Sequence, residues 1–240
     1  MITLLYLYDA LHNQAQILKH WVGDMPMIYT ALGDSITFGK DASSMVNAYP
    51  QLIVSALNTR SRKVTAHVLA RSGWSSKNLL DSVLWRGASM IHQSDVVSIW
   101  IGGVDLANAA ISSLRSQSPL PAKQLATNYS RNLCSLLSLI KKRSRARIIC
   151  CTQYNPFPNS PLAVESISQF NRIIQDSARR YDASVAPTHM WFEGKQANLI
   201  YGYRNGKIED ALSGSLPIHP NDRGHRLIAT GLSPYLIPGR

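Results

Sequence analysis

Tyr29-Thr-Ala-Leu-Gly-Asp-Ser-Ile-Thr-Phe-Gly39 is the stretch of sequence that decides the fold. Residues 28–33 are largely apolar and end at Gly33-Asp34-Ser35, which predicts a buried strand that runs directly into a turn. Such a turn would hold the Ser35 hydroxyl above the edge of a sheet. Ser35 is therefore the first candidate for a nucleophile, because a turn after a buried strand exposes a side chain that the sheet keeps in place.

The rest of the chain alternates between helix and strand patterns. Apolar residues at helical spacing predict helices over 47–57, from 75 or 76 onward, and over 122–141, 164–180 and from about 221. Apolar runs predict further strands over 64–69, 95–101, 147–152 and 183–186. Continuous apolar strands between helices are typical of a parallel sheet with helices on both faces. Chemistry in such sheets collects at the carboxyl ends of the strands, so we expect Ser35, Gly73 and Gly103 to come together there.

Length and composition are those of one α/β domain. The chain has 240 residues and is 45% hydrophobic. We predict a single domain over 25–240, preceded by an N-terminal extension over 1–24. No apolar run reaches the roughly 18–20 residues that span a bilayer, and the apolar start is short, lacks a basic leader and is interrupted by Asp9. With three cysteines in no disulfide spacing, these features predict a cytoplasmic protein without signal peptide or transmembrane segment.

The net charge of +11 is concentrated in two short runs, Arg60–Lys63 and Lys141–Arg147. We interpret them as solvated helix ends, where cations also suit the negative end of the helix dipole. Peripheral contact with an anionic membrane is the alternative. No nucleic-acid partner is expected, because no aromatic residues interleave with the runs and the chain has neither a Gly-x-Gly-x-x-Gly turn nor a phosphate-loop lysine motif.

A serine nucleophile needs a base, and His219 is the best candidate. It lies in Pro217-Ile-His-Pro-Asn-Asp-Arg-Gly-His225, in a predicted loop before the last helix. His225 is the second candidate, but it falls inside the helix, where a structural role is expected. The histidines do not cluster at metal-ligand spacing, so we predict no metal and no cofactor.

Four segments resemble the sequence blocks of the GDSL, or SGNH, hydrolase superfamily, in the order that is usual there. They are Leu32-Gly-Asp-Ser-Ile-Thr-Phe-Gly39, Ala70-Arg-Ser-Gly-Trp-Ser-Ser76, Ile99-Trp-Ile-Gly-Gly-Val-Asp-Leu106 and Ile218-His-Pro-Asn-Asp-Arg-Gly-His-Arg-Leu-Ile-Ala229. The third and fourth are most similar to the spore-germination lipase-like branch, and this resemblance implies association with spores as an alternative to a purely cytoplasmic location.

The resemblance implies a flavodoxin-like three-layer α/β/α sandwich with a parallel sheet of about five strands. It also implies that Ser35 is the nucleophile, that His219 is the general base, and that the backbone N–H groups of Ser35 and Gly73 form the oxyanion hole. The substrate pocket would include Asp34, Trp74, Gly103, Val104 and Asp105.

Two positions depart from the family pattern. Val104 stands where an asparagine usually donates its side-chain amide to the oxyanion, and Leu216 stands where an aspartate usually orients the histidine. We considered Asp210, its neighbour Glu209, or a backbone carbonyl near Ser215 as the group that orients His219. The prediction is therefore a Ser35–His219 dyad with a reduced oxyanion hole.

The expected function is hydrolysis of carboxylic acyl esters through an acyl-enzyme on Ser35, with a small ester or lipid as substrate. Trp74, Phe38 and Val104 favour an acyl chain over a sugar ring. The alternative, motivated by Val104 and Leu216, is a catalytically impaired protein of the same fold that binds an ester, lipid or acetylated sugar. Asp34 has two possible roles: its carboxylate accepts a hydrogen bond from the turn backbone, or it helps to position the catalytic loop. The first is the expected one, because aspartate commonly bonds to the backbone of a turn.

Overall fold

The structure is a computed structural model that describes residues 26–116, 118, 121–212 and 216–237. The extension predicted for residues 1–24 lies outside the described residues. At the centre is a five-stranded sheet in which every neighbouring pair is parallel, in the order β2-β1-β3-β4-β5. The strands are β1 (Met27–Gly33), β2 (Val64–Ala70), β3 (Val96–Trp100), β4 (Arg147–Cys151) and β5 (Ser184–Ala186).

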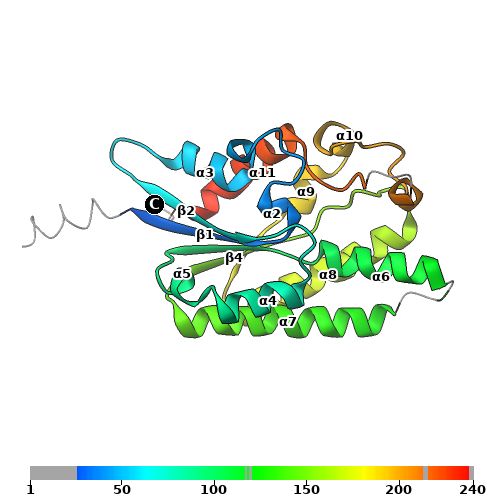
Figure 1. The fold of residues 1–240 in the computed structure, drawn as a ribbon, viewed down its shortest axis with the longest axis horizontal. Helices are drawn as coiled ribbons and strands as arrows, with labels where there is room; N and C mark the ends of the chain where they lie inside the picture. The colour runs from blue at the N-terminus through cyan, green and yellow to red at the C-terminus, as the bar shows by residue number, and fades with distance from the viewer. Residues whose placement is uncertain (1–25, 117, 119–120, 213–215, 238–240) are drawn as a thin grey trace, which may run out of the picture.

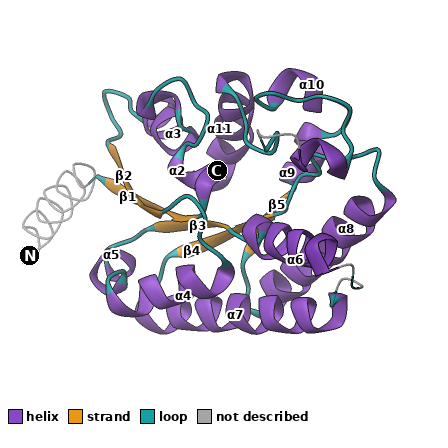
Figure 2. Cartoon of the chain, turned by 45° about the vertical axis from the view of Figure 1, so that its right-hand side comes forward, coloured by secondary structure: helices purple, strands orange, loops and turns teal. Residues whose placement is uncertain are grey.

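Helices cover both faces of the sheet (Figure 1). One face carries α3 (Tyr49–Leu57) and α11 (Asp222–Leu236), together with the short α2 (Ser35–Phe38), α9 (Thr188–Phe192) and α10 (Gln196–Leu199). The other carries α4 (Ser76–Trp85), α5 (Ala88–His92), α7 (Ala122–Arg143) and α8 (Pro161–Arg180), with α6 (Gly103–Ser116) at one end (Figure 2). Two 3-10 helices, η1 (Met45–Asn47) and η2 (Ile208–Leu212), complete the fold.

Alternate residues of each strand pack into two separate apolar layers, because successive side chains point to opposite faces of a sheet. In β3, Val96 and Trp100 pack with α3 and α11, whereas Val97 and Ile99 pack with α4, α7 and α8. The order 2-1-3-4-5 with helices on both faces is the flavodoxin-like arrangement. The predicted three-layer sandwich of about five parallel strands is therefore confirmed.

The predicted elements match the observed ones closely, with one substantial omission. Helix α6 was not predicted, because Gly102 and Gly103 after β3 indicate a turn and hide the helix that begins at Gly103. In the described part of the chain, no helix has the length and apolar character needed to cross a membrane. All three cysteines are free, and Cys150 and Cys151 are buried.

The register of the central strands explains how the site is assembled. Gly33, the last residue of β1, pairs with Ala70 of β2 and with Trp100 of β3. The three strands therefore end at the same level, and the segments that follow them meet at one edge of the sheet. These segments begin with Asp34, Arg71 and Ile101, and they include Ser35, Gly73 and Gly103.

Candidate active site

Ser35 lies in the turn that the sequence predicts after β1, and the short helix α2 begins at this residue. Asp34 caps this helix, and its Oδ1 accepts a 3.0 Å hydrogen bond from the backbone N–H of Ile36. Gly33 permits the tight turn, because a Cβ at this position would collide with the side chain of Thr37 and lie 2.5 Å from the carbonyl oxygen of Trp100. The turn therefore holds Ser35 in a fixed position at the carboxyl edge of the sheet.

His219 lies between Ser35 and an aspartate that comes from another loop. Its Nε2 is 3.0 Å from Oγ of Ser35, and its Nδ1 is 2.9 Å from Oδ2 of Asp41. An ionised carboxylate only accepts hydrogen bonds, so the Nδ1 proton is donated to Asp41 and Nε2 is left to accept the Ser35 proton. The three side chains form the arrangement of a serine nucleophile, a histidine base and an orienting carboxylate.

The loop that carries His219 is fixed from both sides. The carbonyl of His219 accepts a 2.9 Å hydrogen bond from Tyr201 N–H, and Pro220 forms a bridge with Ile200. Immediately afterwards Asn221 caps α11 by accepting hydrogen bonds from the N–H groups of Arg223 and Gly224.

Burial lowers the pKa of His219 below its ordinary value. The charge and hydrogen bond of Asp41 oppose this shift, and the charge of Lys40 adds to it. The side chain of His219 is 11% exposed. His219 is therefore neutral at pH 7 and available to accept a proton.

Asp210, considered from the sequence as the group that orients His219, does not contact its imidazole, and Leu216, at the usual position of an aspartate, lines the cavity instead. Asp210 instead accepts hydrogen bonds from the backbone N–H groups of Asn205 and Lys207 and holds that turn together. The carboxylate in contact with Nδ1 of His219 is that of Asp41, in the loop after α2, and its other oxygen lies 3.1 Å from Nζ of Lys40. In place of the predicted pair of Ser35 and His219, the structure shows a hydrogen-bonded chain of three side chains, Ser35, His219 and Asp41.

A cavity of about 350 Å³ opens beside Ser35. Asp34, Gly73, Gly103, Val104 and His219 all line it, as do Leu216 and residues from α6, α8 and η2. The aliphatic and aromatic side chains of its wall are Ile36, Val104, Leu106, Ala107, Ala110, Tyr154, Pro156, Phe157, Leu162, Ala163, Ile167, Ile208, Ala211, Leu216 and Ile218. The predicted meeting of Ser35, Gly73 and Gly103 is confirmed.

Two backbone N–H groups are available near the nucleophile. Those of Ser35 and Gly73 have no hydrogen-bond partner within the described ranges. Gly73 has a φ of 84°, a left-handed conformation that favours glycine. Val104, which replaces the usual asparagine, lines the same cavity from the first turn of α6, and Asn108 lines it one turn further along.

Two residues predicted for the substrate pocket lie elsewhere. Trp74 packs against the apolar layer that α4 and α7 share, and Asp105 accepts hydrogen bonds of 2.8 Å and 2.7 Å from N–H and Oγ of Ser76. Neither is among the described residues that line the cavity, and the same holds for Phe38, which is 41% exposed. Asp105 therefore joins the start of α6 to the start of α4.

Asp34 is fully enclosed, and burial raises its pKa to about 7. The nearby charge of Asp105 raises it further, while the hydrogen bond from Ile36 lowers it. This hydrogen bond is the structural role favoured from the sequence. The carboxyl group also lines the cavity, on the side of Gly103.

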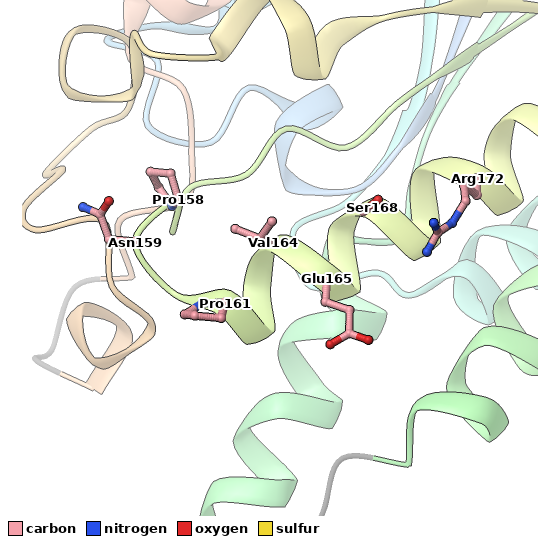
Figure 3. Close-up of a pocket in the computed structure, with 7 residues that line it drawn as sticks. All are labelled: Pro158, Asn159, Pro161, Val164, Glu165, Ser168 and Arg172. Carbon is pink, nitrogen blue, oxygen red and sulfur yellow. The ribbon is translucent and has the colours of Figure 1, made fainter.

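His225, the second candidate base, is completely buried in α11, where its Nδ1 lies 3.4 Å from the backbone N of Tyr49. Burial lowers its pKa to about 4. An open depression of about 510 Å³ lies on the outer side of α8, around Val164, Glu165 and Arg172 (Figure 3). It shares no lining residue with the cavity at Ser35.

The fold and the site are those of an ester hydrolase, and comparison with protein families leads to the same class. The profile of the GDSL-like lipase/acylhydrolase family matches residues 31–227, and the chain belongs to this family. It is therefore a carboxylic ester hydrolase.

Among curated proteins, the chain is 26% identical over 219 residues to spore germination lipase LipC of Bacillus licheniformis, covering 87% of this chain and 95% of the relative. This match confirms the resemblance to the spore-germination branch.

Solved structures show the same fold. The lipase Lip_vut3 from a goat rumen metagenome superimposes with a TM-score of 0.71 at 24% identity, covering 89% of this chain and 99% of that one. A catalytic mutant of Axe2, an acetylxylan esterase from Geobacillus stearothermophilus, superimposes with a TM-score of 0.68 at 18% identity, covering 90% and 97%.

Proposed function

We propose that this protein hydrolyses carboxylic esters through an acyl-enzyme on Ser35, with His219 as general base and Asp41 as the carboxylate that orients it. The continuous hydrogen-bonded chain from Asp41 through His219 to Ser35 carries the proposal. A serine hydroxyl becomes a useful nucleophile when an adjacent base takes its proton, and the pKa of His219 leaves that base neutral at pH 7.

The reaction follows from these positions. Oγ of Ser35 attacks the ester carbonyl carbon while its proton passes to Nε2 of His219. The resulting oxyanion accepts hydrogen bonds from the N–H groups of Ser35 and Gly73. Collapse of this intermediate breaks the bond to the alcohol, which leaves with the proton from His219. Water then attacks the acyl-enzyme by the same route, and the carboxylic acid is released with Ser35 restored.

The substrate we propose is an ester with an acyl chain of several carbons, because the cavity wall is mostly aliphatic. A sugar ring would require several hydrogen-bonding side chains, whereas Val104, Leu106, Ile167 and Ile208 offer none. The relatives named above include both lipases and an acetylxylan esterase, so the cavity wall rather than the fold supports the choice. The partner is thus a small ester or lipid molecule.

A fluorophosphonate probe tests the nucleophile directly. We expect covalent labelling at Ser35, no labelling of Ser35→Ala, and strongly reduced labelling of His219→Ala. Hydrolysis of nitrophenyl esters from acetate to decanoate should show a rise in kcat/KM with chain length. A preference for acetate would exclude the acyl-chain proposal while leaving the nucleophile intact.

The alternative is a protein that keeps the pocket but turns over poorly, and the position of Val104 favours it. With Val104 in place of a donor, the oxyanion hole has two N–H groups instead of three donors, and one such donor is typically worth about 2.7–4 kcal/mol. Stoichiometric binding of a decanoate ester with no hydrolysis, by a protein that the probe does not label, would establish this alternative.

A further inference from the structure

The loop between α2 and α3, residues 39–47, carries the orienting carboxylate in an unusual backbone conformation. Asp41 has a φ of 65°, in the left-handed region that, apart from glycine, asparagine and aspartate, residues seldom adopt. Such a conformation persists only where the surrounding structure enforces it. Contacts from outside the loop therefore help to keep Oδ2 of Asp41 at Nδ1 of His219.

Asp222, the first residue of α11, makes the contacts that hold this loop. Its Oδ1 accepts a 2.8 Å hydrogen bond from the backbone N–H of Ser43, and its Oδ2 accepts a 2.6 Å hydrogen bond from Oγ of Ser43. Asn47 donates to the same Oδ2 at 3.3 Å and to Oγ of Ser43 at 2.8 Å. A single carboxylate thus fixes both the backbone and the side chains of the loop.

These contacts are a second link between the two segments that the hydrogen bond of Asp41 and His219 also joins. Ser43 follows Asp41 by two residues, and Asp222 follows His219 by three, so the same two segments are joined twice, once at the site and once beside it. Asp222 does not touch the described atoms of Ser35 or His219 through any hydrogen bond, and its effect on the site must pass through the loop.

We propose that Asp222 is a positioning residue that holds the loop of residues 39–47 against α11 and thereby keeps Asp41 on His219. This inference rests on the proposed function, since it assigns a purpose to the alignment of His219. The Asp222 carboxylate is not required for helix capping, because Asn221 already caps α11.

The charge state of Asp222 suits a permanent contact. Hydrogen bonds from Ser43 lower the pKa of Asp222, and the neighbouring Arg226 and His225 lower it further. The carboxylate therefore stays ionised throughout the range in which His219 titrates. The groups that act on His219 itself are Asp41, which raises its pKa, and Lys40, which lowers it.

The kinetic test compares Asp222→Ala with Asp222→Asn. In Asp222→Ala we expect kcat to fall roughly 10- to 100-fold with little change in KM, because misplacement of a catalytic group by about 1 Å costs on that order. In Asp222→Asn the amide oxygen still accepts from Ser43 N–H, and its NH₂ can donate to Oγ of Ser43, so most of the activity should remain. Asp176→Ala, which removes an exposed carboxylate on α8 that pairs with Arg179, is the matched control and should leave kcat unchanged.

A double-mutant cycle separates positioning from general stability. If Asp222 acts through Asp41, adding Asp222→Ala to Asp41→Ala should cause no further loss of kcat. Equal losses in the two backgrounds would overturn the proposal, because they would show an effect independent of Asp41.

An NMR titration of the His219 ring, assigned with His219→Gln, gives a readout that needs no turnover. Loss of the Asp41 contact should lower the pKa of His219 in Asp222→Ala and leave it unchanged in Asp222→Asn. If the wild-type protein fails to hydrolyse esters but this shift appears, the proposed function fails and the positioning role stands. If the wild-type protein hydrolyses esters and neither kcat nor the pKa of His219 changes in Asp222→Ala, the positioning role is overturned alone.

Discussion

Oδ2 of Asp41 lies 2.9 Å from Nδ1 of His219, although 178 residues separate the two along the chain. The usual family position for this carboxylate, three residues before the histidine, is Leu216, which lines the cavity wall. The carboxylate that contacts the histidine therefore lies in the loop that follows Ser35 and α2, and not in the loop that carries the histidine.

Asp41→Asn should lower kcat on nitrophenyl esters by on the order of 10⁴-fold, as replacement of the orienting aspartate does in serine proteases, because the amide no longer fixes the tautomer of His219. Asparagine tolerates the left-handed backbone at this position, so the loss should occur without unfolding. Asp210→Asn is the control, and we expect nearly wild-type kcat. A large loss in Asp210→Asn with none in Asp41→Asn would reverse the assignment.

Val104→Asn should raise kcat by about tenfold or more, because a side-chain amide in the first turn of α6 would supply a third donor to the oxyanion. The measurement is kcat on a short nitrophenyl ester, for which binding in the cavity contributes least. Val104→Ala changes the volume without adding a donor and should not increase the rate. Equal kcat values for Val104→Asn and Val104→Ala would show that the amide cannot reach the oxyanion.

Asp34→Asn should change how stability depends on pH. The folded state holds the proton of Asp34 up to a pKa of about 7, whereas the unfolded chain releases it near its ordinary value of 3.8. Wild-type stability is therefore reduced progressively as the pH rises from about 4 to 7, by at most roughly 1.4 kcal/mol per pH unit.

Asparagine keeps an acceptor for Ile36 N–H and does not titrate. We expect the free energy of unfolding of Asp34→Asn, measured by urea titration, to increase relative to that of the wild type as the pH rises from 5 to 8. A difference that stays constant over this range would contradict the raised pKa.

Ala107→Phe should shorten the acyl chain that the protein prefers. Ala107 lies on α6 and lines the cavity, so a phenyl ring there would occupy space that the distal part of a long chain needs. We expect kcat/KM to fall for decanoate esters and to stay nearly unchanged for acetate esters. Val164→Phe, in the outer depression on α8, adds the same ring away from the cavity and should leave the chain-length profile unaltered.

Sequence patterns predict those site residues whose position depends only on the neighbouring strand or helix. Ser35 and Gly73 each follow a strand whose end is visible as an apolar run, and His219 precedes a helix with a recognisable cap at Asn221. Parallel strands with a common register then bring these ends together.

Asp41 could not be found in the same way, because its role depends on a left-handed residue and on contacts to α11 across the molecule. The available signal was weak: a carboxylate soon after the nucleophile, in a chain that lacks one before the histidine. Trp74 and Asp105 were misplaced for a related reason, since their direction depends on how α4 packs against α6 and α7.

The location of Asp41 has a consequence for chimaeras between this protein and its relatives. Ser35 and Asp41 lie six residues apart in the first half of the chain, whereas His219 lies in the second half. A crossover near the middle of the chain therefore keeps the first two together and separates them from the histidine. A hybrid that joins residues 1–150 of this chain to the second half of a relative with the usual aspartate would offer two carboxylates to one imidazole. The reciprocal hybrid would offer none, so the two products of a single crossover should differ sharply in activity although both keep the same fold.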